Sequence, residues 1–224
     1  MKVIKNVRIY DFNNYIEHGY VIFDEQIHDV GSMAQYKNNN YEEIDGNNAL
    51  LMPGLINGHS HIYSTFARGM SAPFNPTTFR ELLEQLWWKL DRYLNNEMTY
   101  FSGIVSGIEY IKNGVTTIID HHASGEIIGS LHSLEDALDK VGLRKVLCFE
   151  TSDRFNIDHC IQENLDYIKT SSSTSSGLFG LHASFTLSDQ TLKKVSSVLN
   201  DTPIHIHVAE SIEDQIDSLS KHNT

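Results

Sequence analysis

From residue 50 onward, short apolar runs alternate with longer segments in which apolar residues recur at helical spacing. The short runs are rich in β-branched residues, as in residues 115–119 (VTTII), and they are bounded by polar residues and glycines. Runs of this length and composition predict buried strands. We place five of them, at about residues 50–57, 115–119, 145–149, 177–181 and 203–207.

The segments between these strands carry apolar residues three and four positions apart, which is the period of an amphipathic helix. They predict helices over about residues 77–94, 96–113, 133–141, 158–169, 189–199 and 212–219. In the second of these helices one face holds the apolar residues Met98, Phe101, Val105, Ile108 and Ile111. Repeated strand–helix units with buried strands imply an α/β fold, in which helices wrap a parallel sheet.

The first 52 residues follow a different pattern. Residues 3–10, 20–23 and 26–30 read as short strands, separated by polar turns such as the asparagine run at 38–40. Three short strands are too little material for an independent core, so we expect them to pack on something else. We therefore divide the chain into a β arm, residues 1–52, and an α/β domain, residues 53–224.

Histidines follow the first and last predicted strands. His59 and His61 come after the first strand, and His207 ends the fifth, with Glu210 three positions further on. Alternate residues of a strand point the same way, so His59 and His61 can hold one ion. The carboxyl ends of parallel strands gather on one face, so we expect His207 to join them. Three imidazoles with a carboxylate close by form a donor set typical of hydrolytic metal sites.

Two segments carry a family resemblance, residues 52–61 (MPGLINGHSH) and residues 205–210 (HIHVAE). With them the chain resembles the amidohydrolase superfamily of metal-dependent hydrolases, over essentially its whole length. Residues 86–92, 119–124 and 148–154 are similar, more narrowly, to the SsnA-type aminohydrolases associated with selenium metabolism. That group is itself similar to guanine deaminases and to chlorohydrolase-like deaminases.

The resemblance implies a TIM-type (β/α)8 barrel with a small β-sandwich built from both chain ends, to which residues 1–52 supply the N-terminal arm. A barrel of this type takes roughly 250 residues, and residues 53–224 hold only about five of its eight βα units. The family's further histidine after the sixth strand and its aspartate after the eighth have no counterpart here. We therefore expect a partial barrel, either a truncated product or part of a longer sequence.

The resemblance also implies roles for single residues. His59, His61 and His207 would ligate one divalent metal ion, most readily zinc, although iron, manganese and nickel accept the same ligands. Glu210 would act as the general acid and base. Binuclear members of the family have a lysine at the end of the fourth strand, where this chain reads GLH at residues 180–182. The resemblance therefore points to the mononuclear, deaminase-like type.

The implied activity is hydrolytic deamination of a small heterocycle such as a purine, a pyrimidine or a triazine. The sequence does not decide which heterocycle is the substrate, or whether an amine or a halide leaves. The competing hypothesis is an inactive truncated fragment that acts only as a binding or self-associating module, because open sheet edges invite pairing. Without the family's aspartate, we expect the isolated chain to lack measurable deaminase activity.

Three further residues at strand ends are candidate substrate contacts: His122, Arg154 and His182. A structural role is an equally open interpretation of each, since polar groups at strand ends serve both purposes. His205 shares a strand face with His207, but Glu210 lies at the right spacing from His207, which favours His207 as the ligand. We expect His205 to be a buried, hydrogen-bonded barrel histidine, and His121 to be structural.

The net charge of the chain excludes some classes of binding partner. The net charge of −12 disfavours nucleic acid and anionic membrane surfaces, so we expect a small-molecule substrate and allow for a homo-oligomer. The two cysteines, Cys148 and Cys160, form no disulfide framework and read as buried thiols. The first residues lack the apolar run of a signal peptide, so we expect a reduced, cytoplasmic compartment.

Overall fold

The short strands expected near the N-terminus pair into one sheet in the computed structural model, which describes residues 1–71 and 73–223. The central strand β1 (Lys2–Tyr10) pairs antiparallel with β2 (Tyr15–Phe23), which pairs with β3 (Ile27–Ser32). Two further strands run parallel to β1: β4 (Glu42–Asp45), which the sequence did not predict, and β5 (Leu50–Leu51), which is the start of the strand predicted at about 50–57. The described residues of this unit thus form one sheet with the short 3₁₀ turn η1 (Met33–Gln35), and its place in a two-layer sandwich stays a prediction.

By its internal contacts the chain divides into two compact units, Met1–Gly54 and Leu55–Thr224. The second unit contains a parallel sheet in the order β6 (Leu55–Ser60), β7 (Val115–His122), β8 (Arg144–Phe149) and β9 (Ser175–Gly177). A second parallel pair is formed by β10 (Phe179–Ala183) and β11 (Ile204–His207). A parallel bridge between Thr151 and Leu181 joins β10 to the segment that follows β8.

The order of strands in this unit therefore follows the order of the chain, as repeated βα units require. The α/β fold with parallel strands is confirmed, and a partial barrel stays a prediction. The first predicted strand is interrupted: residues 52–54 separate β5 from β6, because Pro53 has no N–H to donate to a sheet.

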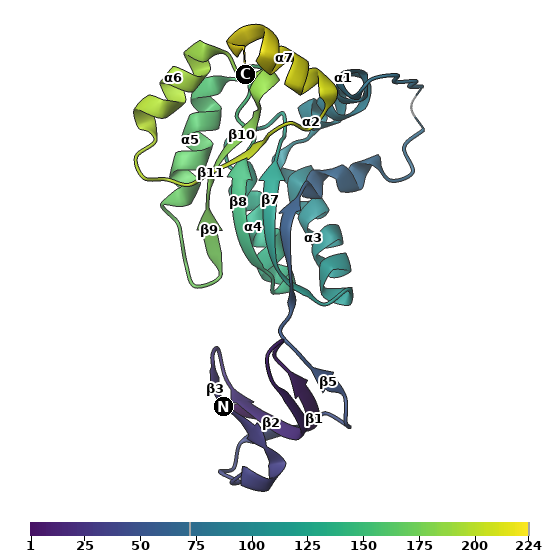
Figure 1. The fold of residues 1–224 in the computed structure, drawn as a ribbon, viewed down its shortest axis with the longest axis vertical. Coiled ribbons are helices and arrows are strands. Elements are labelled where there is room, and N and C mark those ends of the chain that lie inside the picture. The colour runs from purple at the N-terminus through teal and green to yellow at the C-terminus, as the bar shows by residue number, and fades with distance from the viewer. Residues whose placement is uncertain (72, 224) are drawn as a thin grey trace. The chain divides into compact units, whose positions relative to one another are not determined.

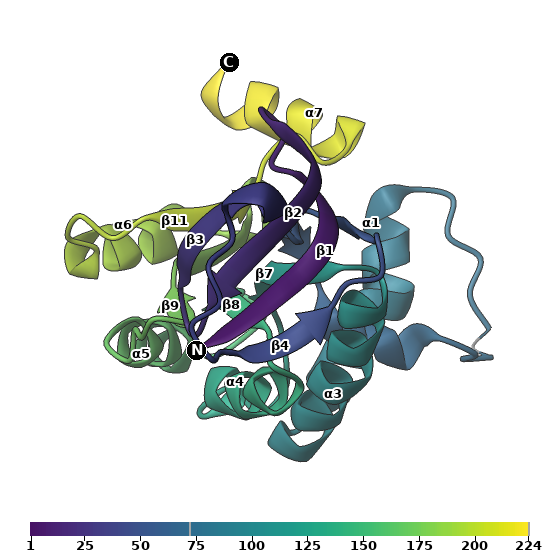
Figure 2. The same cartoon turned by 90° about the horizontal axis from the view of Figure 1, so that it is seen from below.

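Helices separate the strands of the second unit, except β9 and β10, between which only Leu178 lies. The segment after β6 holds the 3₁₀ turn η2 (Ile62–Ala67), then α1 (Phe79–Leu82), the π-helical stretch η3 (Leu83–Trp87) and α2 (Trp88–Tyr93). The later helices are α3 (Asn96–Lys112), α4 (Ser130–Val141), α5 (Ile157–Ile168), α6 (Asp189–Val198) and α7 (Ile212–His222), with the turn η4 (Ser184–Thr186) after β10. Figure 2 shows α3, α4, α5 and α6 following one another along the outside of the strands, which run through the interior as Figure 1 shows.

Four of these helices begin at a residue whose side chain forms an N-cap. The side chain of the residue before each helix accepts a hydrogen bond from a backbone N–H of the first turn in α3, α5, α6 and α7; the capping residues are Asn95, Asn156, Ser188 and Ser211. These bonds satisfy donors that the helix itself leaves unpaired.

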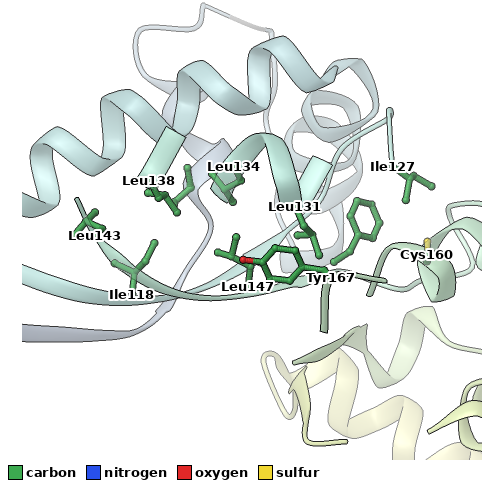
Figure 3. Packing of buried hydrophobic residues seen from close by; sticks show 11 residues of the cluster. Ile118, Ile127, Leu131, Leu134, Leu138, Leu143, Leu147, Cys160 and Tyr167 are labelled. Atoms are coloured by element: carbon green, nitrogen blue, oxygen red, sulfur yellow. The ribbon is translucent and has the colours of Figure 1, made fainter. Parts of the chain in front are cut away.

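The main core of the second unit lies between α4 and the strands that it covers. Leu131, Leu134 and Leu138 project from one face of α4 onto Ile118 of β7 and Leu147 of β8 (Figure 3), and all are fully buried. The same cluster includes Cys160 and Tyr167 of α5. Both cysteines of the chain are free and buried, as the sequence predicted.

The helix α3 does not pack with its large apolar residues. Phe101 is 54 % exposed and Ile108 is 48 % exposed, while the buried side of the helix holds small residues: Thr99, Ser102, Gly103, Ser106 and Gly107. A helix side made of small residues lets two backbones approach closely, and α4 packs against this side of α3. The apolar stripe in the sequence thus marks an exposed face of α3 in the structure.

We expect Gly103→Ala to destabilise the fold by about 1–3 kcal/mol, because it overpacks this helix contact. A Cβ at Gly103 would lie 2.7 Å from Cβ of Ala137 and 2.9 Å from Cδ1 of Leu134. In an open helix the same change would stabilise, since alanine is the better helix former. Gly107→Ala is the matched control, because its Cβ would lie 3.2 Å from the nearest atom, Cγ2 of Val141. Chemical denaturation should rank Gly103→Ala as the less stable variant, and a gain in stability would contradict the packing argument.

The two outer strands of the second unit carry exposed apolar residues. Ile56 of β6 is 71 % exposed and Ile204 of β11 is 51 % exposed. Among the described residues, β6 pairs only with β7, and β11 pairs only with β10. Exposed apolar edges favour association with another chain, which is consistent with the predicted homo-oligomer; the oligomer itself stays a prediction.

No described helix is long and apolar enough to cross a membrane.

Candidate metal centre

Three histidines from the two outer strands converge on one point. His59 belongs to β6, His61 follows directly after it, and His207 ends β11. The Nε2 atom of His207 lies 3.1 Å from Nε2 of His61 and 3.2 Å from Nε2 of His59. One ligand atom from each ring lies within 4.8 Å of the others, the arrangement that can hold a metal ion. The structure therefore brings together the trio that the sequence singled out.

Two of the three rings are held by main-chain carbonyl groups. Nδ1 of His61 lies 2.8 Å from the carbonyl oxygen of His121, and Nδ1 of His207 lies 2.9 Å from that of His182. A carbonyl oxygen can only accept, so each ring must carry its proton on Nδ1, and its Nε2 lone pair faces the common point. Burial, with the neighbouring rings of His207 and His59, lowers the pKa of His61 to about 3. The ring is then neutral at pH 7, the form that binds a metal.

The turn after β6 is anchored from the neighbouring strand. Asp120 of β7 is completely buried, and its Oδ1 accepts hydrogen bonds from the N–H of Ile62, at 2.8 Å, and from the hydroxyl of Ser60, at 3.0 Å. Both donors are direct neighbours of His61 in the chain. Asp120 thereby fixes the backbone that carries two of the three histidines.

Two histidines that the sequence analysis set aside border the trio. His205 is half-buried rather than buried, and its Nε2 lies 2.9 Å from Nδ1 of His59. His121 is completely buried, and its ring lies parallel to that of His205, with centroids 5.0 Å apart and planes at 7°. Spacing along the chain carried no signal for either contact, because the partners come from different strands.

A cavity of about 400 Å³ opens beside the three histidines. Besides the trio, it is lined by the aromatic and apolar residues Tyr63, Phe79, Leu83, Trp87 and Trp88 and by the polar residues Ser60, Ser64, Asp91, Glu150, His182 and Glu210. A cavity with aromatic walls and a few convergent polar groups is typical of a small-molecule site. Glu210 and the three histidines therefore line the same cavity.

Glu210 follows a strained turn. Ala209, the residue before it, has φ of 55°, in the left-handed region that side chains other than glycine rarely occupy. Backbone strain of this kind costs about 1–3 kcal/mol and gathers at functional sites. Partial burial raises the pKa of Glu210, which the nearby His207 opposes. The carboxyl group therefore holds a proton more readily than a solvated glutamate does.

A buried ionic network forms one wall of the cavity. Arg154 donates from Nη1 to Oδ2 of Asp91 at 3.0 Å and from Nη2 to Oε1 of Glu150 at 2.6 Å. Its guanidinium also lies over the ring of Trp88, 4.9 Å from the ring centroid. Burial raises the pKa of Asp91 to about 6 and that of Glu150 to about 7, although Arg154 opposes both shifts. The sequence analysis did not single out Asp91, whose only signal is an acidic residue inside an apolar helical stretch.

The three predicted substrate contacts lie at different depths. His182 lines the cavity, with its Nδ1 hydrogen-bonded to the hydroxyl of Thr186 at 2.8 Å. His122 is completely buried outside the lining, with Nε2 3.4 Å from the hydroxyl of Thr99. Arg154 also stands behind the lining, occupied by two carboxylates. His182 therefore lies on the cavity wall, and the other two residues lie behind it, while a contact of any of the three with substrate stays a prediction.

We expect Glu150→Gln to change how stability depends on pH. The folded-state pKa of about 7 lies above the ordinary 4.5, so the folded protein holds this proton more tightly than the unfolded chain. The contribution of this proton to the free energy of unfolding is fully present below pH 4.5 and is lost as the pH rises through 7. Relative to the wild type, Glu150→Gln should therefore gain stability between pH 5 and pH 8.

Thermal unfolding of the two proteins across this pH range is the measurement. Glu97→Gln, on an exposed residue of α3, is the control and should keep a constant difference in stability from the wild type between pH 5 and pH 8. A constant difference between wild type and Glu150→Gln would show that Glu150 keeps an ordinary pKa in the folded state.

Known proteins resemble this chain in sequence and in fold. Residues 50–224 match the model of the amidohydrolase family. The chain is 30 % identical over 223 residues to a 5'-deoxyadenosine deaminase of Methanocaldococcus jannaschii, covering 96 % of this chain and 50 % of the relative. It is 27 % identical over 224 residues to a 5-methylthioadenosine/S-adenosylhomocysteine deaminase of Carboxydothermus hydrogenoformans, covering 95 % of this chain and 49 % of the relative. The chain thus spans about half the length of these curated relatives.

Solved structures share the fold at lower identity. A guanine deaminase from C. acetobutylicum with bound guanine superposes with a TM-score of 0.83 at 16 % identity, over 99 % of this chain and 56 % of that one. An adenosine deaminase from Xanthomonas campestris with bound zinc superposes with a TM-score of 0.81 at 19 % identity, over 100 % of this chain and 52 % of that one.

Proposed function

Because the chain belongs to the amidohydrolase family, we propose that it supplies the metal-binding side of an active site for hydrolytic deamination of a small heterocycle. The observation that carries the proposal is the convergence of three Nε2 atoms beside Glu210 in one cavity. The relatives are named for adenosine derivatives, so an adenine base, whose amino group sits on an sp² ring carbon, is the substrate type that they favour. An amino-substituted pyrimidine or triazine also carries its amino group on an sp² ring carbon.

The donor set fits a divalent metal ion. Tetrahedral zinc with Zn–N bonds of about 2.0–2.1 Å separates its nitrogen ligands by about 3.3 Å. The separations between Nε2 of His207 and those of His61 and His59 are 3.1 and 3.2 Å, close to this value. We assign zinc to His59, His61 and His207, while iron, manganese and nickel accept the same ligands. Such an ion supplies Lewis-acid activation of water at neutral pH.

Glu210 is the proton carrier in this proposal. It lines the cavity with His207, and its raised pKa keeps the carboxyl group able both to take and to release a proton. Glu210 carries the two protons of the attacking water in turn, one to a ring nitrogen and one to the leaving amine. The C–N bond then breaks, the ring carbon keeps the oxygen, and ammonia leaves.

The remaining cavity residues bind and orient the ring. Trp87, Trp88 and Phe79 offer flat apolar surfaces against which a heterocycle can stack. His182 presents its ring to the ligand, and Glu150 lies close behind it, with 3.6 Å between Nε2 of His182 and Oε1 of Glu150. Arg154 and His122, predicted as substrate contacts, act in this proposal from behind the wall.

The test combines metal binding with ammonia release. The purified chain should bind close to one equivalent of zinc, and a chain that binds none contradicts the proposal. Activity is measured with the chain alone and mixed with the C-terminal half of the M. jannaschii relative, on adenosine derivatives, cytosine, guanine and aminotriazines. Ammonia release that needs both polypeptides supports the proposal. Zinc binding without ammonia release from any substrate in the mixture favours a binding module without activity.

A further inference from the structure

The histidines of the trio differ in what holds their second ring nitrogen. Nδ1 of His61 and Nδ1 of His207 each meet a main-chain carbonyl oxygen, which can only accept a hydrogen bond. Nδ1 of His59 instead meets Nε2 of His205 at 2.9 Å. An imidazole nitrogen can donate or accept, depending on which of its two nitrogens carries the proton. The hydrogen bond of His59 therefore has two possible directions, whereas those of its partners have one.

Only one of these directions leaves His59 able to bind a metal ion. If the proton lies on Nδ1 of His59, the lone pair of its Nε2 faces Nε2 of His207, 3.2 Å away. If the proton lies on Nε2 of His205, a neutral His59 carries its own proton on Nε2, and the ligand position is blocked. The choice between the two directions is made by the tautomer of His205.

We propose that His205 is a positioning residue that accepts the Nδ1 proton of His59 and so fixes His59 in its metal-binding tautomer. The inference rests on the proposed function in one respect, that the trio holds a metal ion. His205 itself is not a ligand, because the cluster of ligand atoms comprises His59, His61 and His207 among the described residues. It acts on the metal site only through His59.

The surroundings hold the ring of His205 in place for this contact. Its position two residues before His207 on β11 directs it to the same face of the strand. The ring of His121 lies parallel to it, with centroids 5.0 Å apart, and His121 is itself completely buried. His205 is thus packed between a buried ring and the edge of His59, whose centroid lies 5.0 Å away.

The test replaces His205 by two residues that differ in one property. In His205→Gln the amide oxygen reaches about as far as Nε2 and can still accept from His59, whereas His205→Leu keeps bulk and removes the acceptor. We expect His205→Leu to bind zinc about 10–100-fold more weakly, the usual effect of losing a partner of a metal-bound histidine. His205→Gln should stay within a fewfold of the wild type. Zinc affinity is measured by competition with a chromophoric chelator.

His132→Leu is the control for losing a histidine outside the site, since His132 contacts Glu135 on α4 instead. Thermal unfolding without metal identifies any variant that fails to fold. Equal zinc affinity in His205→Leu and the wild type would overturn the proposal, and so would an equal loss in His205→Gln and His205→Leu.

A second measurement needs no metal and no activity. Long-range ¹H–¹⁵N spectra of the metal-free wild type should show His59 as the Nδ1–H tautomer, and the His205→Leu spectrum should show a mixture. A wild-type His59 protonated on Nε2 would overturn the proposal. If the wild type binds no zinc at all, the proposed function fails, and the tautomer of His59 still decides the role of His205.

Discussion

We expect His61→Ala to weaken zinc binding by the chain about a hundredfold or more. Structural zinc sites with four ligands bind with roughly 10–16 kcal/mol, so one ligand contributes about 3 kcal/mol, which is about a hundredfold in affinity. His61 is the member of the trio with the most complete support, because its Nδ1 is tied to the carbonyl of His121 and its Nε2 lies 3.1 Å from Nε2 of His207. The measurement is zinc affinity by chelator competition.

His18→Ala is the control for this experiment, since His18 is an exposed histidine of β2 whose Nε2 contacts Asn6. It should bind zinc as the wild type does. If His61→Ala and His18→Ala bind zinc equally well, the ion sits elsewhere on the chain, and the assignment of the trio as ligands is wrong.

Glu210→Gln should lower the rate of ammonia release by a factor of roughly 100 to 10,000, the usual contribution of a general acid or base. The amide has nearly the shape of the carboxyl group but cannot take a proton from water and pass it on. Zinc content should stay close to that of the wild type, because Glu210 lies outside the cluster of ligand atoms. The rate is measured per bound zinc, in the mixture with the C-terminal half of the relative.

Glu97→Gln serves again as the control and should leave the rate unchanged. A variant Glu210→Gln that loses zinc, while each remaining zinc site works at the wild-type rate, would make Glu210 a ligand and remove its role as proton carrier. Unchanged zinc content with unchanged turnover would assign proton transfer to another group in the cavity, with His182 and Glu150 as the residues to substitute next.

The order of the elements could be read from the sequence because each depends on residues close together in the chain. The strand predicted at 145–149 is observed as Arg144–Phe149, and the helix predicted at 158–169 as Ile157–Ile168. A β-branched run or a helical apolar period reports local burial, and a capping side chain such as Asn156 acts within one turn. The helix predicted at 77–94 contains the π-helical stretch Leu83–Trp87, which the apolar period did not reveal.

The face by which a helix packs was not decided by its apolar period. In α3 the large residues, such as Phe101, are exposed, and Gly103 meets Ala137 of α4. Burial of large side chains and close approach of two backbones are competing ways to pack a helix, and the neighbouring helix selects between them. A single sequence shows both faces of α3 and does not show its neighbour.

In the candidate site, too, the local relations could be predicted from the sequence and the contacts between elements could not. Parity along a strand and the His–x–x–Glu spacing already selected His59, His61, His207 and Glu210, because these relations are local and the parallel sheet brings its strand ends together. Only the tertiary structure decided that His205 meets His59 and that Arg154 joins two buried carboxylates instead of lining the cavity. These contacts join residues from different elements, where side-chain reach and the packing of neighbouring strands set the distance, and a sequence pattern carries no record of that distance.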